Sequence, residues 1–86
     1  MLVHIGNNSS IEAKDIIAVI DADTSTVSKV TRDFLKNAQD ENRVEIISDD
    51  LPKSFIIAKN PKGGNVRIIA SCVSPATIMG RIEKLF

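Results

Sequence analysis

Short apolar runs separated by turn-forming residues are the feature that most restricts the fold of this chain. Three of these runs are Ile16 to Ile20, Phe55 to Ala58 and Ile68 to Ala70. Runs of this length suit β-strands, and they are far shorter than the roughly 20 residues that cross a bilayer. Because the runs are continuous rather than alternating, we expect strands that are covered on both faces.

Turn residues between the runs predict where further strands begin and end. Met1 to Ile5 is stopped by Gly6 to Ser10, and a short strand around Ser10 to Ala13 can pair back with it. Asn60 to Gly64 is a hairpin loop, because proline and two glycines supply the dihedral angles of turns. The other expected strands are Val44 to Ser48, Lys53 to Lys59 and Asn65 to Val73.

Two segments have helical spacing instead. From Thr26 to about Gln39 one stripe is apolar, with Thr24 or Ser25 as the N-cap. The last helix starts at Ser74-Pro75, a capping residue followed by the proline of a first helical position. The first stripe consists of Val27, Val30, Phe34, Leu35 and Ala38, and the second of Ile78, Met79, Ile82 and Leu85.

The expected fold class is therefore α+β: a small, mostly antiparallel sheet with two helices in the order ββ(β)αβββα. With 86 residues the chain is expected to form a single domain over residues 1–86. Two short helices cover roughly one face of such a sheet, so an apolar face remains, and we expect self-association to bury it. Gly80 in the last helix would permit a neighbour to approach closely, or is a tolerated imperfection.

The cellular compartment is expected to be the cytoplasm. Cys72 is the one cysteine and cannot form an internal disulfide, which favours a reducing compartment. The first apolar stretch ends at Gly6 and lacks the apolar core of a secretory signal. No membrane partner is expected.

Charge is distributed unevenly, although the net charge is zero. Residues 1–50 carry five basic and ten acidic side chains, whereas residues 51–86 carry six basic side chains and Glu83 as the one acid. The basic half can face phosphates, or it can face the acidic half of a neighbouring copy. The third interpretation is that the fold intermixes both halves into an ordinary surface.

Catalytic and metal-binding patterns are nearly absent. His4 lies between apolar neighbours, and Cys72 has no adjacent base that would activate it. Asp21-Ala22-Asp23 and Asp49-Asp50 could ligate a cation, but capping and turns explain such residues equally well. The glycine-rich loop joins two strands and opens no helix, unlike a phosphate-binding loop. We expect no enzyme, no cofactor and no metal.

A basic set flanks and occupies the expected hairpin. It consists of Lys53, Lys59, Lys62 and Arg67. Such a hairpin can lie against a DNA phosphate backbone, and an assembly that repeats it would bind by avidity without reading bases. Without Tyr or Trp and with three Phe, stacking on single strands is disfavoured. The competing interpretation is an edge hairpin kept soluble by lysines.

Several stretches together resemble the bacterial RemA/RemB family of extracellular matrix regulators. Within this family the chain is more similar to the RemB branch. They are Leu2 to Gly6, Ser10 to Ile20, the helix from Thr26, Pro52 to Ile57, and Ser71 to Arg81. The resemblance implies a domain related to the LytTR-type DNA-binding fold that assembles into rings and contacts double-stranded DNA through basic residues. It also implies regulation of matrix and biofilm genes, and a paralogous family member as a further partner.

The resemblance implies DNA-binding roles at some positions of this chain, but other DNA-contacting positions of the family are occupied by different residues. Lys14 matches a DNA-contacting arginine, and Lys53 matches the last cation of an arginine-rich turn. Asp50 and Leu51 stand where RemA-like chains have paired arginines, so two phosphate contacts are missing. The expected DNA-binding residues are Lys14, Lys53, Lys59, Lys62 and Arg67.

Three functions remain open. The first is an oligomeric DNA-binding regulator of matrix genes. The second is an oligomeric protein-interaction module without DNA binding, and the third is a small-molecule sensor or enzyme. Salt-sensitive binding of duplex DNA would distinguish the first from the other two.

Overall fold

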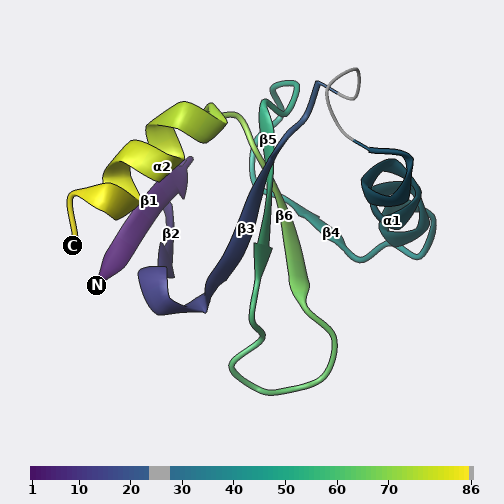
Figure 1. The fold of residues 1–86 in the computed structure, drawn as a ribbon, viewed down its shortest axis with the longest axis horizontal. Coiled ribbons are helices and arrows are strands. Elements are labelled where there is room, and N and C mark those ends of the chain that lie inside the picture. The colour runs from purple at the N-terminus through teal and green to yellow at the C-terminus, as the bar shows by residue number, and fades with distance from the viewer. Residues whose placement is uncertain (24–27, 86) are drawn as a thin grey trace.

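The computed structural model describes residues 1–23 and 28–85 of the chain (Figure 1). Its elements follow the expected order of strands and helices. They are β1 (Leu2–Gly6), β2 (Ser9–Glu12), the 3-10 turn η1 (Ala13–Asp15), β3 (Ile16–Asp21), α1 (Lys29–Asp40), β4 (Val44–Ile46), β5 (Ser54–Ala58), β6 (Arg67–Ser71) and α2 (Pro75–Glu83).

A four-stranded sheet in the order β3-β5-β6-β4 forms the centre of the molecule. β3 pairs antiparallel with β5, and β5 pairs antiparallel with β6, whereas the short β4 runs parallel to β6. The parallel pair exists because α1 connects β3 to β4 across the sheet, as parallel crossovers require. The α+β class with mostly antiparallel strands is confirmed.

The β1–β2 hairpin forms a separate two-stranded sheet. Its loop consists of Asn7 and Asn8, both with positive φ (48° and 63°), the arrangement of a tight hairpin turn. Gly6 precedes the loop with φ 113°, and a Cβ atom there would lie 3.2 Å from Val73 Cγ2. Gly6 thus lets the hairpin approach the segment that leads into α2.

One face of the central sheet is covered by this hairpin together with α2 (Figure 1). Buried Ile56 and Ile69 of the sheet pack with Ile5 of β1 and Ile78 of α2. Two buried hydroxyls hold these layers together. They are Ser71, whose Oγ donates to the Ile5 carbonyl oxygen (2.6 Å) and accepts from Val73 N–H (3.0 Å), and Ser54, which donates to the Val73 carbonyl oxygen (2.8 Å).

The opposite face is covered by α1. Leu35 and Ala38 pack there against Phe55, Ile68 and Ala70. The expectation that a whole face stays uncovered was therefore wrong, because the helices lie on opposite faces and the hairpin supplements α2. On the second face, α1 leaves open the part beside β4.

The start and orientation of α1 also differ from the expected helix. It begins at Lys29, and the Ser28 Oγ accepts from Thr31 N–H (3.2 Å) as N-cap. The expected caps Thr24 and Ser25, and Val27 of the stripe, lie outside the described residues. Val30 is 79% exposed and Phe34 36% exposed, so the apolar stripe is wider than the surface that the sheet offers it.

β3 was expected to be covered on both faces, and it is covered only in part, because it lies at an edge of the sheet. Ile16 and Val19 pack with the core on one face and Ile20 with the core on the other, but all three are only half-buried. A register shift between Ile16 and Ala18 places Ile17 in an irregularity, where it is 60% exposed. The strands that do match the expectation are β5 and β6, because they lie inside the sheet with nearly every residue buried.

Candidate nucleic-acid interface

The loop between β5 and β6 projects beyond the central sheet (Figure 1). Its turn is built locally: the Asn60 side chain accepts from Lys62 N–H (3.0 Å), and the Asn60 carbonyl accepts from Gly63 N–H (2.9 Å). Gly63 and Gly64 have φ of 81° and 87°, which glycine adopts without strain. Because β5 and β6 are inner strands, protection of a sheet edge does not explain the lysines of this loop.

Three exposed lysines gather at this end of the molecule, and we call them the basic end: Lys14, Lys59 and Lys62. Lys14 lies in η1, just before β3, and Lys59 directly follows β5. The Lys59 N–H donates to the Asp15 carbonyl oxygen (2.7 Å), so the two segments are fixed side by side. Among residues 1–23 and 28–85, no carboxylate lies within 4.0 Å of these three ammonium groups.

Two carboxylates accompany the basic end. Glu12 lines a shallow hollow together with Lys14, Asp15, Lys59 and Pro61. The pKa of Glu12 is lowered, first by a hydrogen bond from the Met1 ammonium group (2.9 Å) and to a smaller extent by Lys14. Both Glu12 and Asp15 reduce the positive potential that phosphates would meet.

Arg67 is bound to Glu45 and does not stand free beside the lysines. Its Nε and Nη2 atoms each donate to one carboxylate oxygen of Glu45 at 2.8 Å. This bidentate hydrogen bond lowers the pKa of Glu45 and raises that of Arg67. A phosphate would have to displace Glu45 to reach this guanidinium group.

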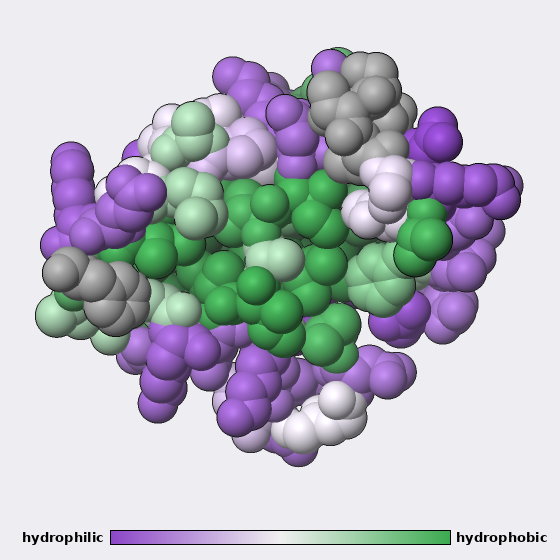
Figure 2. All heavy atoms as spheres, viewed as in Figure 1, coloured by the Kyte–Doolittle hydropathy of each residue, from purple (hydrophilic) through white to green (hydrophobic). Residues whose placement is uncertain are grey.

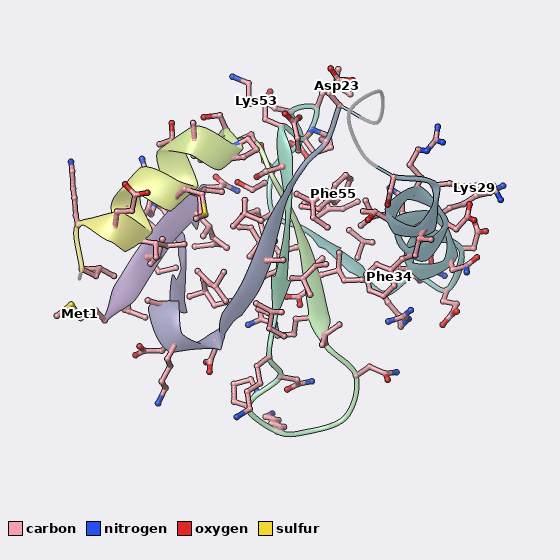
Figure 3. All side chains as sticks on the ribbon, in the orientation of Figure 1. Met1, Asp23, Lys29, Phe34, Lys53 and Phe55 are labelled. Carbon is pink, nitrogen blue, oxygen red and sulfur yellow. The ribbon has the colours of Figure 1, made fainter. Side chains whose placement is uncertain are left out.

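Lys53 lies at the opposite end of the sheet from the basic end. It precedes β5, whereas Lys59 follows it, and six residues of extended chain span about 20 Å. Asp21, Asp23 and Lys53 line one surface depression there, and Figure 3 shows Asp23 and Lys53 at the same end of the molecule. The five residues expected to bind DNA are thus divided: Lys14, Lys59 and Lys62 lie at one end, Arg67 is in an ion pair, and Lys53 lies among carboxylates.

The segment that departs from the family pattern borders an apolar groove. Asp49, Asp50 and Leu51 form its rim between β4 and β5, and Leu51 is 88% exposed. The groove continues along α1, and Phe55 lies on its floor. Sequence reasoning missed this groove, since it arises from how α1 leaves part of the sheet uncovered. The nearest signal was Leu51, an apolar residue within a polar turn.

The residues weighed for catalysis or metal binding are dispersed over the described part of the chain. Between residues 1–23 and 28–85, no group of three or more His, Cys, Asp or Glu side chains is placed to hold a metal ion. The His4 carbonyl accepts from Arg81 Nη1 (2.7 Å), which joins β1 to α2. Cys72 is half-buried and lies beside Gly6, where a Cβ atom would be 3.6 Å from its sulfur.

Comparison with known protein families shows to which family the chain belongs. The family model for RemA-like proteins, described as extracellular matrix regulatory protein A-like, matches residues 2–82. The chain belongs to the RemA-like family. The match extends from β1 to the last turn of α2, so both the basic end and the groove lie within the RemA-like region. A search of curated proteins found no match to the chain.

Neither α1 nor α2, nor any other helical stretch in the described ranges, has the length and apolar character that a bilayer span requires.

Proposed function

We propose that this RemA-like protein is an oligomeric, cytoplasmic DNA-binding regulator of extracellular matrix and biofilm genes, and not an enzyme. The observation that carries the proposal is the basic end, where Lys14, Lys59 and Lys62 lie at one end of the sheet and no carboxylate of the described residues is within ion-pair distance of them. Flexible ammonium groups on a projecting loop suit contacts with phosphates, which position a protein on a duplex without reading its sequence. The site offers no aromatic platform for single strands.

Three lysines make a weak site in one protomer. Each phosphate contact contributes through counterion release, and only an assembly that repeats the site gains avidity on one duplex. The resemblance to ring-forming relatives supports such an assembly. Lys53 and Lys14 lie at opposite ends of the sheet, so both could serve one duplex only if neighbouring copies bring unlike ends together.

Asp50 and Leu51 modify this proposal. They occupy the two positions where RemA-like chains have paired arginines. As a result, a carboxylate and an exposed apolar side chain lie at the groove rim. We propose that the chain belongs to the RemB-like branch and binds DNA less tightly than arginine-containing relatives. A paralogous member that supplies the missing arginines in a mixed assembly is a further proposed partner.

The proposal is tested by exchanging lysines of the basic end for acids. Lys59→Glu with Lys62→Glu should lower duplex affinity at about 50 mM salt by at least about tenfold, because two attractive contacts become repulsive. The control is Lys29→Glu with Lys36→Glu, two exposed lysines of α1 that give the same change in net charge. Equal loss in both variants, or no loss in the first, would contradict the assigned site.

A protein-interaction module without DNA binding is the second candidate. The groove along α1 favours it, because Phe55 and Leu51 present apolar surface beside Asp49 and Asp50. Grooves of this kind accept apolar segments of partners. An assembled protein that leaves duplex DNA unbound at about 50 mM salt would favour this function over DNA regulation.

A further inference from the structure

The outer edge of β3 carries the broadest apolar surface in the view of Figure 2. The edge strand runs in front of the sheet in Figure 1, and the hydrophobic colouring of Figure 2 is centred over it. Ile17 is 60% exposed there, and the four residues that complete the apolar run are half-buried: Ile16, Ala18, Val19 and Ile20. Such a surface is typical of a contact between proteins.

The apolar surface continues onto α1. Phe34 extends from the helix toward the sheet in Figure 3, and Val30 lies one helical turn before it. Both side chains are exposed although they belong to the helix's apolar stripe. A partner that covers β3 would therefore also cover the part of α1 that the sheet leaves open.

The β3 edge has little protection against pairing. Among the described residues no strand pairs with its outer side, and no charged residue occurs between Ile16 and Ile20. The irregularity at Ile17 interrupts the edge at one position only, and Ala18 to Asp21 keep a regular register with β5. Natural proteins place lysines or prolines on such edges when pairing is to be avoided.

Charges at the two ends of β3 indicate which partner fits. At the start of the strand Lys14, Lys59 and Lys62 outnumber Glu12 and Asp15, and Glu12 is paired with the Met1 ammonium group. At its end Asp21 and Asp23 outnumber Lys53, so the two ends of β3 carry opposite excess charge. A second copy in antiparallel orientation would place the Lys14 end of each protomer beside the Asp21 end of the other. A parallel copy would place like charges together, which is destabilising.

We propose that the β3 edge is an antiparallel contact between two copies of this chain, with Ile17 at its centre and Val30 and Phe34 at its side. This contact specifies the mode of the self-association on which the proposed function depends. It is isologous, so it closes a pair, and a larger ring requires a second, different contact.

Ile17→Asp tests the contact. A carboxylate in the closed interface would be buried without a partner, so we expect association at least about tenfold weaker, seen as a lower mass in light scattering without DNA. The matched control is Ile46→Asp, an exposed isoleucine on β4 at the other edge of the sheet, which should keep the wild-type mass. Circular dichroism of both variants verifies that they fold.

A charge exchange tests the antiparallel orientation independently. Lys14→Glu alone, and Asp21→Lys with Asp23→Lys alone, should each weaken association, because each places like charges across the pair. An equimolar mixture should restore the mass, since the two variants complement each other at both ends of β3. Failure of the mixture to recover would overturn the orientation.

The possible outcomes separate this contact from the proposed function. If the wild-type protein is assembled and Ile17→Asp keeps its mass, or if both edge variants lose it equally, the β3 contact is wrong while assembly stands. If the wild-type protein is a monomer at every concentration, proposed oligomer and contact both fail. Loss of assembly confined to Ile17→Asp supports the contact, whatever the DNA measurement shows.

Discussion

At the scale of single residues, the contact between the β1–β2 hairpin and α2 depends on small side chains. Gly6 brings the hairpin close to Val73, and the buried Ser71 hydroxyl joins Ile5 to the same segment. A larger residue at the first position or a lost hydroxyl at the second would disturb two layers at once.

Gly6→Ala is expected to destabilise the fold. Its φ of 113° is unfavourable for any residue with a Cβ atom, and that atom would lie 3.2 Å from Val73 Cγ2. We expect a loss of at least about 1 kcal/mol in the free energy of unfolding. The contrasting variant is Gly80→Ala, where no atom lies within 4 Å of the added Cβ, and where the gain in helix propensity is about 1 kcal/mol. Urea denaturation measures both, and effects of the same sign would contradict the prediction.

Ser71→Ala removes a donor and an acceptor from the interior. The Ile5 carbonyl oxygen would lose its partner in a buried position, and the Val73 N–H would lose its partner in a partly buried one. The expected cost is about 1–3 kcal/mol in the free energy of unfolding. Ser10→Ala on the exposed side of β2 serves as control, and an equally small effect at both serines would disprove the role of the buried hydroxyl.

At the scale of elements, strand positions followed from the sequence more closely than strand environments did. The runs at β3, β5 and β6 and the Asn60–Gly64 turn were predictable, because apolar clustering and turn residues are local signals. That β3 lies at an edge was not predictable, since all three runs look alike. Whether Val30 faces the sheet depends on how α1 crosses it, which no local pattern encodes.

The Glu45–Arg67 pair, which links β4 to β6, leads to a prediction about pH. The folded-state pKa of Glu45 is lowered below its usual value of 4.5, so the pair stabilises the fold above that pH and loses its effect as the pH falls through the folded-state pKa. Both side chains are partly exposed, so the contribution is at most about 1 kcal/mol. Glu45→Gln should therefore be less stable than wild type at pH 7, and the difference should shrink as the pH falls below 4.5 through the folded-state pKa. A difference that does not change with pH would contradict this origin.

At the scale of the whole molecule, the charged residues are divided between the two ends of the sheet, and this division does not follow the acidic and basic halves of the sequence. Lys14, Lys59 and Lys62 lie at one end of the sheet, and Asp21, Asp23 and Lys53 at the other. The sequence alone could name the lysines but could not group them, because residues that flank one strand lie at opposite ends of it. Nor does the sequence reveal that Arg67 is engaged by Glu45, because the two residues are 22 positions apart in the chain.

The measurement that tests the central claim most directly is duplex DNA binding by the wild-type protein, followed by fluorescence anisotropy between roughly 50 and 200 mM salt. With three phosphate contacts per duplex, affinity should fall about 40-fold over this range, and with six from two protomers about 2,000-fold. A loss of this size would support binding through the basic end and report how many copies engage. Affinity that is absent at the lower salt concentration, or unchanged across the range, would contradict the account.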